Sequence, residues 1–133
     1  MRTVIAAFIV TLLTFLLLDI AWLTQIAIGM YQRALGGMLR SAPSFPAIVA
    51  FYLIYASALT ALAVMPGIER DSVQEAAWRS ALLGFAAYAT YDLTNYATLK
   101  DYPLTLALSD LAWGTFASTI AGILGYLAGQ HFR

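Results

Sequence analysis

The sequence contains no cysteine, a single histidine and few charged residues, and each shortage excludes a class of chemistry. Without cysteine the chain forms no disulfide, no thiolate metal site and no thiol redox centre. With His131 as the only histidine, one chain cannot ligate a haem through two histidines. The formal net charge is +0, so no basic field indicates nucleic acid as a partner. The sequence also has no Ser-His-Asp set, phosphate-binding loop or HExxH motif, and we predict no cofactor.

Apolar residues make up 62% of the 133-residue chain, whereas charged residues make up only 11%. Soluble domains carry roughly 25% charged residues, and a small soluble domain leaves much of its surface exposed to water. The apolar surface is therefore expected to face lipid. Four apolar runs reach the length of about 20 residues that a membrane-spanning helix needs, and membrane strands would be shorter with alternating polarity. The predicted helices cover residues 4–28, 47–65, 76–99 and 104–128.

These helices predict an all-α fold, an integral membrane, antiparallel four-helix bundle that forms one domain over residues 1–133. Pro66-Gly67 predicts the end of the second helix. Ser72 and Glu75 form a capping box that predicts the start of the third helix, with each side chain bonding a free amide. The longest connection, residues 29–46, mixes apolar and basic side chains, as a short amphipathic segment at the membrane interface does.

Basic residues near the predicted helix ends differ slightly in number between the two membrane faces. One face has Arg2, Arg70, Arg79 and Arg133, and the other has Arg33, Arg40 and Lys100. Because basic residues favour the cytoplasmic side, this difference predicts that both termini lie in the cytoplasm. Trp78, Tyr31 and Tyr102 lie near helix ends and are predicted to anchor the chain at the interfaces.

Three aspartates, Asp19, Asp92 and Asp110, fall inside the predicted membrane spans. An ionisable side chain within a span is costly, so it usually faces the bundle interior and marks a functional site. At about 1.5 Å per residue, the three aspartates lie roughly 10–15 Å from one membrane face if the helices alternate in direction. Carboxyl groups at a similar depth on three helices indicate a shared site.

Each of these aspartates is followed three residues later by a side chain that donates hydrogen bonds. The pairs are Asp19 and Trp22, Asp92 and Asn95, and Asp110 and Trp113. A spacing of three places both members of a pair on one helix face, where an indole or amide N–H can satisfy a carboxylate. Tyr88 and Tyr91 widen the polar stripe of the third helix. The predicted ligand- or proton-binding residues are therefore Asp19, Trp22, Tyr88, Tyr91, Asp92, Asn95, Asp110 and Trp113.

Three carboxylates cannot share a low-dielectric site unless a cation enters or some of them stay protonated. The site is therefore predicted to bind protons or a small cationic or polar ligand, because Trp and Tyr rings attract organic cations. Carboxylates also suit Mg²⁺ or Ca²⁺, but three oxygen donors are a thin ligand set, and we predict no metal. The alternative is structural: polar side chains that bond across membrane helices contribute roughly 0.6–2 kcal/mol each.

The fourth predicted helix carries two rows of small residues. Gly114, Ser118 and Gly122 form one row, and Gly125 and Gly129 form a GxxxG match. Such rows let two helices approach closely, so they predict tight packing either inside the bundle or in a homodimer. The other expected partner is the lipid bilayer.

Three segments together resemble a known family. The segments are Leu18–Leu23, Tyr91–Asp101 and Ser109–Gly114, and they are similar to a family of small predicted bacterial membrane proteins classified as domain of unknown function 2177. The resemblance covers nearly the whole chain, and it implies a bacterial inner-membrane location and a four-helix topology. It implies no activity and no functional residues.

Three functional hypotheses remain open from the sequence. The first is a protein that binds or translocates protons or a small cation through its buried aspartates. The second is a membrane enzyme that acts on a lipid or isoprenoid, with paired carboxylates as general acid and base. The third is an accessory or assembly subunit of a larger membrane complex.

Overall fold

The computed structural model describes all 133 residues, which form helices and no strand. The helices make four rods. The first consists of α1 (Arg2–Trp22), the π-helical segment η1 (Leu23–Ala27), α2 (Ile28–Leu35) and the 3₁₀ turn η2 (Gly36–Met38). The second consists of α3 (Phe45–Leu59), the π-helical segment η3 (Thr60–Val64) and α4 (Met65–Glu69). The third and fourth rods are α5 (Val73–Thr98) and α6 (Leu104–His131).

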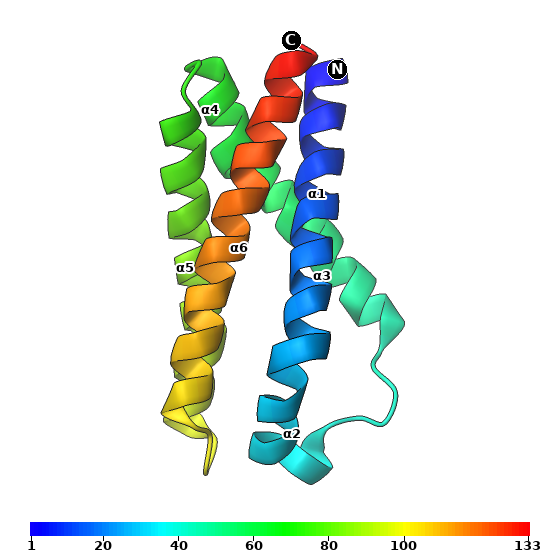
Figure 1. The fold of residues 1–133 in the computed structure, drawn as a ribbon, viewed down its shortest axis with the longest axis vertical. Coiled ribbons are helices and arrows are strands. Elements are labelled where there is room, and N and C mark those ends of the chain that lie inside the picture. Colours follow the sequence, from blue (N-terminus) through cyan, green and yellow to red (C-terminus); the bar gives the residue numbers. More distant parts are fainter.

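The rods alternate in direction, which confirms the predicted antiparallel four-helix fold. Both chain termini and α4 lie at one end, and α2 and the turn between α5 and α6 lie at the other end (Figure 1). The helices α5 and α1 both pack along α6 (Figure 1). Toward Phe45, α3 tilts away from the other helices, so it contacts the bundle mainly at its C-terminal end and through η3 (Figure 1).

Three of the four rods are long and apolar enough to cross a membrane by length and composition. They are Arg2–Met38, Phe45–Glu69 and Leu104–His131. The sequence predicts a fourth apolar span over residues 76–99, and α5 differs because its 26 residues include many polar side chains. It nevertheless exposes large apolar side chains such as Leu82, Phe85 and Leu93, which suit contact with lipid.

The first rod is longer than predicted, because the helix continues past residue 28 to Leu35. It ends at Gly36, whose φ of 43° is a conformation that glycine adopts readily. Met30 and Tyr31 of α2 pack against a buried cluster of Tyr102, Leu106 and Ala107, which explains why this segment stays helical. At about 1.5 Å per residue the rod exceeds the hydrocarbon thickness of about 30 Å, so one end must extend beyond the apolar core.

The predicted helix end at Pro66-Gly67 is wrong, because α4 continues through both residues to Glu69. Pro66 lies in the first turn of α4, where its missing N–H is tolerated. Gly67 allows a close approach of α4 to α5: a Cβ atom there would lie 2.7 Å from the Ala76 Cβ. The glycine therefore provides a helix contact and not a stop.

The predicted capping box at the start of α5 is half confirmed. The backbone N–H of Glu75 donates to the Ser72 hydroxyl at 3.1 Å. The Glu75 carboxylate does not return to the Ser72 amide; it accepts hydrogen bonds from Trp78 and Arg79 and also pairs with Arg70. Since Trp78 is 48% exposed at this end of α5, its position fits the predicted interface anchor.

Both rows of small residues on α6 are buried inside the bundle. Gly114 lies under the Tyr88 ring of α5. A Cβ atom at Gly122 would lie 1.8 Å from the hydroxyl of Ser80, which also belongs to α5. Gly125 and Gly129 face Thr11 of α1 and Ile68 of α4 in the same way. The structure therefore uses these residues for packing within the chain, and the homodimer contact through Gly114, Ser118, Gly122, Gly125 and Gly129 stays a prediction.

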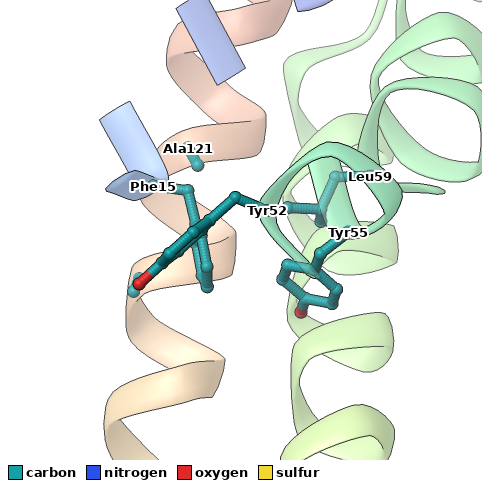
Figure 2. Packing of buried hydrophobic residues seen from close by; sticks show 6 residues of the cluster. Phe15, Tyr52, Tyr55, Leu59 and Ala121 are labelled. Atoms are coloured by element: carbon teal, nitrogen blue, oxygen red, sulfur yellow. The ribbon is translucent and has the colours of Figure 1, made fainter. Parts of the chain in front are cut away.

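An aromatic cluster joins α1, α3 and α6 in the middle of the bundle (Figure 2). The Phe15 ring lies 6.0 Å from the Tyr52 ring and 4.9 Å from the Tyr55 ring, measured between centroids. Leu59, Ala117 and Ala121 complete the cluster. This packing holds two tyrosines of α3 in the bundle interior, and their hydroxyl groups belong to the site described next.

Candidate functional site

Two aspartate–tryptophan pairs on α1 and α6 cross between the helices. The Trp113 indole N–H of α6 donates to Asp19 Oδ1 of α1 at 3.3 Å, and the Trp22 indole N–H of α1 donates to Asp110 Oδ1 of α6 at 3.3 Å. The two indole rings stack with a centroid distance of 5.0 Å and an interplanar angle of 6°. Because α1 and α6 are antiparallel, the same three-residue spacing on both helices produces this reciprocal arrangement.

Tyr52 of α3 supplies the second hydrogen bond to Asp19. Its hydroxyl donates to Asp19 Oδ2 at 2.5 Å, so both carboxylate oxygens of this buried residue have a donor. The neighbouring Tyr55 hydroxyl bonds the Ser118 hydroxyl of α6 at 2.7 Å. The aromatic cluster of Figure 2 therefore holds both the Tyr52 that donates to Asp19 and the Tyr55 that bonds α6.

Asp92 of α5 is fully buried and joins the site from the other side of α6. The Tyr102 hydroxyl donates to Asp92 Oδ1 at 3.3 Å, and its Oδ2 atom has no hydrogen-bond partner among the donors of the chain. The carboxyl group of Asp110 lies near that of Asp92. Two neighbouring carboxyl groups can share a proton.

A cavity of about 300 Å³ lies between these helices. Two carboxyl groups, from Asp19 and Asp110, reach its wall, and five of the other lining residues are aromatic. The complete lining is Asp19, Leu23, Tyr31, Phe51, Tyr55, Ala87, Tyr88, Tyr91 and Asp110. We refer to the part of the molecule around this cavity, from Asp19 to Leu35 and from Tyr88 to Trp113 together with the start of α3, as the pocket half.

No basic side chain pairs with the carboxyl groups of the pocket half. The ion pairs of the structure both involve Glu75, which lies near the opposite end of the bundle with Arg70 and Arg79. The hydrogen bonds to Asp19, Asp92 and Asp110 come from neutral indole and phenol groups. Neutral donors stabilise a carboxylate without cancelling its charge, so the cavity can accept a positive ligand.

The structure brings most of the predicted site residues to this cavity or to its carboxyl groups. Asp19, Tyr88, Tyr91 and Asp110 line the cavity. Trp22 and Trp113 bond the two lining aspartates, and Asp92 lies behind Asp110. Asn95 is half-buried beside the Tyr102 hydroxyl and does not reach Asp92 through the predicted pairing.

Four tyrosines of the site were not predicted from the sequence. Tyr52 and Tyr55 lie in an apolar stretch of α3 and carry no acidic neighbour in the sequence that would single them out. Tyr102, predicted to be an interface anchor, is only 4% exposed and bonds Asp92 instead. Tyr31, predicted to be a second anchor, lines the cavity. Tyr31 and Tyr102 both belong to the site because α2 and the α5–α6 turn fold onto the end of the bundle.

The three aspartates do not converge as metal ligands, because no group of three acidic or histidine side chains in the chain has the required spacing. Asp19 and Asp110 face the cavity, whereas Asp92 lies behind Asp110. Divalent cations such as Ca²⁺ require six or more oxygen ligands at short distance. The geometry therefore favours a ligand that contacts carboxylates and aromatic rings together.

Comparison with known proteins gives one match. Residues 4–127 match the family described as predicted membrane protein, DUF2177. No curated protein and no solved structure matches the chain.

Proposed function

The chain belongs to the DUF2177 family of predicted membrane proteins, and we propose that it binds a small organic cation of the ammonium class in its intramembrane cavity. The observation that carries this proposal is the composition of the cavity wall. Two carboxyl groups and five aromatic rings meet there without a basic side chain. An uncompensated carboxylate in a low-dielectric site is costly, and a bound cation removes that cost.

The size and shape of the cavity support a ligand of few atoms. Its volume of about 300 Å³ lies at the lower end of the range of small-molecule sites, about 300–1,000 Å³. Aromatic rings attract a quaternary or primary ammonium group through their negative faces, and desolvation strengthens this attraction to about 2 kcal/mol. Tyr55 and Tyr88 flank the carboxyl groups of Asp19 and Asp110, so one cation can contact both kinds of group.

The stacked tryptophans provide an internal reporter of binding. The chain has three tryptophans, and a Trp78→Phe variant keeps only the Trp22–Trp113 stack, whose indoles bond the cavity aspartates. We expect choline to change the fluorescence of this variant saturably in neutral maltoside micelles. The uncharged isostere 3,3-dimethylbutan-1-ol is expected to bind at least about tenfold more weakly, which corresponds to about 1.4 kcal/mol.

Substitution of the acidic residues completes the test. Asp19→Asn and Asp110→Asn keep the shape of the wall and remove its charge, so both are expected to weaken choline binding. Asp101→Asn, in the exposed turn before α6, is the matched control and is expected to bind normally. Equal affinity for choline and its uncharged isostere, or full binding by the Asp19→Asn/Asp110→Asn double variant, would falsify the proposal.

Proton binding is a second candidate, and it is favoured by the proximity of Asp92 to Asp110 and by the Asp92 Oδ2 atom without a hydrogen-bond partner. A carboxyl group that keeps its proton at neutral pH gives an infrared C=O band distinct from the bands of carboxylates. An Asp92→Asn variant that leaves this region of the spectrum unchanged excludes the second candidate. No comparable observation favours an enzyme or an accessory subunit.

We also propose a bacterial inner-membrane location with both termini in the cytoplasm. Four arginines support this orientation, because they cluster at the end where both termini lie (Figure 1). They are Arg2, Arg70, Arg79 and Arg133. Fusion of a periplasm-dependent alkaline phosphatase to the C-terminus tests the orientation, and an active fusion contradicts it.

A further inference from the structure

Packed side chains lie at the end of the pocket half that carries α2. A buried cluster of Tyr102, Leu106 and Ala107 fills the space between α2 and the start of α6. Met30 and Tyr31 of α2 pack against this cluster, and Tyr31 also lines the cavity. A ligand that arrives from water along the bundle axis therefore meets packed side chains before it reaches Asp110.

The cavity opens to the surface of the bundle where three of its lining residues are exposed. Its rim consists of Leu23, Phe51 and Tyr91, which are 39%, 43% and 49% exposed. These residues come from η1, α3 and α5, so the rim joins three elements that surround one gap. All three side chains are large and mainly apolar, as expected for a surface that faces lipid.

The rim lies at a depth that a lipid headgroup can reach. Tyr91 is seven residues before the end of α5, which lies at the end of the bundle that carries α2 (Figure 1). At about 1.5 Å per residue this separation is roughly 10 Å. Amphiphiles at the interface occupy this zone, where headgroups and the first part of the acyl chains meet.

We infer that the ligand of this cavity is an amphiphile with an ammonium headgroup, which enters from the bilayer through the rim of Leu23, Phe51 and Tyr91. This inference rests on the proposed cation binding and adds the route and the apolar chain. The headgroup contacts Asp19 and Asp110, whereas the chain passes the rim and stays against the exposed apolar face of α3. A water-soluble ammonium ion has the same headgroup chemistry but leaves the rim empty.

Two probes separate these ligand sources. Tetramethylammonium carries the headgroup alone, and dodecyltrimethylammonium adds a chain. Both are titrated against the Trp78→Phe variant in neutral maltoside micelles, and the partition of dodecyltrimethylammonium into the micelles is measured in parallel. We expect dodecyltrimethylammonium to bind at least about tenfold more tightly than tetramethylammonium after correction for partition.

Because the chain has no native cysteine, a single introduced cysteine can be labelled to obstruct the rim. Leu23→Cys labelled with N-phenylmaleimide places a bulky ring in the rim, and Leu17→Cys with the same label is the matched control. Leu17 lies on the same rod, is 67% exposed and does not line the cavity. We expect the label at residue 23 to weaken dodecyltrimethylammonium binding about tenfold more than tetramethylammonium binding, because only dodecyltrimethylammonium places a chain in the rim.

Each outcome has a separate meaning. Equal corrected affinities for the two probes, or the same loss of both probes from the labelled Leu23→Cys variant, overturns the placement of the chain in the rim. In that case the proposed cation binding stands as long as tetramethylammonium still depends on Asp19 and Asp110. If neither probe binds the unlabelled protein, both the inference and the proposed function fail.

Discussion

The two halves of this bundle solve the problem of polar groups in a membrane in opposite ways. In the terminal half, which contains α4, the start of α5 and the end of α6, small residues bring the helices into close contact. The buried hydroxyl groups of Thr11 and Ser80 have no hydrogen-bond partner there, and they face Gly125 and Gly122. In the pocket half, large aromatic residues keep the helices apart and donate hydrogen bonds to the carboxyl groups.

The difference shows how residue size decides between packing and binding along one helix. On α6 the change from the aromatic pocket half to the closely packed terminal half occurs at Gly114, which lies under the Tyr88 ring. Beyond this residue the small side chains of Ser118, Gly122, Gly125 and Gly129 are buried, and the helices pack closely there. Before it, Asp110 and Trp113 reach across to α1, and the rings around them enclose the cavity.

Among the substitutions that test this difference between the halves, a large side chain in the terminal half is expected to have the largest effect on stability. Gly122→Leu forces α5 away from α6, because even a Cβ atom at this position would meet the Ser80 hydroxyl at 1.8 Å. We expect the free energy of unfolding in mixed micelles to fall by roughly 3 kcal/mol. Gly37→Leu is the control, since no atom lies within 4 Å of a Cβ there. Equal effects of the two substitutions would show that the close packing does not stabilise the fold.

Loss of the crossed hydrogen bonds tests the pocket half. Trp22→Phe and Trp113→Phe each leave one aspartate oxygen without its indole donor, and we expect each to lower the free energy of unfolding by about 1 kcal/mol. The double variant is expected to lose less than the sum, because both residues share one stack. Trp78→Phe is the control. Strict additivity would argue against a coupled pair.

Tyr102→Phe is a further test of the pocket half, because it removes the one hydrogen-bond donor that Asp92 has. We expect a loss of slightly less than 1 kcal/mol, about the net value of one hydrogen bond between membrane helices. Tyr96→Phe changes the same group at an exposed site near the end of α5 and is expected to have no effect. An unfolding midpoint that is identical for both variants contradicts the role of Tyr102 in the buried site.

The smallest effect is expected at the end of the terminal half. Glu75→Gln weakens the contacts with Arg70 and Arg79, which are partly exposed to solvent. Exposed ion pairs contribute little, so we expect a smaller change in the free energy of unfolding than the change caused by Tyr102→Phe. Thermal unfolding at low and high salt measures it. A loss comparable to that of the tryptophan variants would show that charge also stabilises this half.

Hydropathy was sufficient to predict the four helices, because a chain with so much apolar surface requires lipid as its solvent. The end at Pro66-Gly67 was wrong, since a local rule for helix termination does not include the contact between Gly67 and Ala76. The extension to Leu35 was missed for a related reason. It depends on the buried cluster around Tyr102, which comes from a segment far away in the sequence.

The aspartates and tryptophans of the site were predictable because charge is rare in a span and because their spacing repeats. The partner of each tryptophan was not, since the same spacing permits bonds within one helix or across two. The structure shows that Trp22 bonds Asp110 and Trp113 bonds Asp19. Tyr52 and Tyr55 carried no signal, because a tyrosine in an apolar run has the same pattern whether its hydroxyl faces the interior or the interface.

The central claim is that a cation occupies the cavity between Asp19 and Asp110. An experimental structure with iodomethyltrimethylammonium tests it most directly, because iodine can be located by its anomalous scattering. We predict one iodine peak inside the cavity, between the two carboxyl groups and the rings of Tyr55 and Tyr88, that is lost in the Asp19→Asn/Asp110→Asn variant. A cavity that holds only water, or an iodine peak that persists in this variant, would contradict the account.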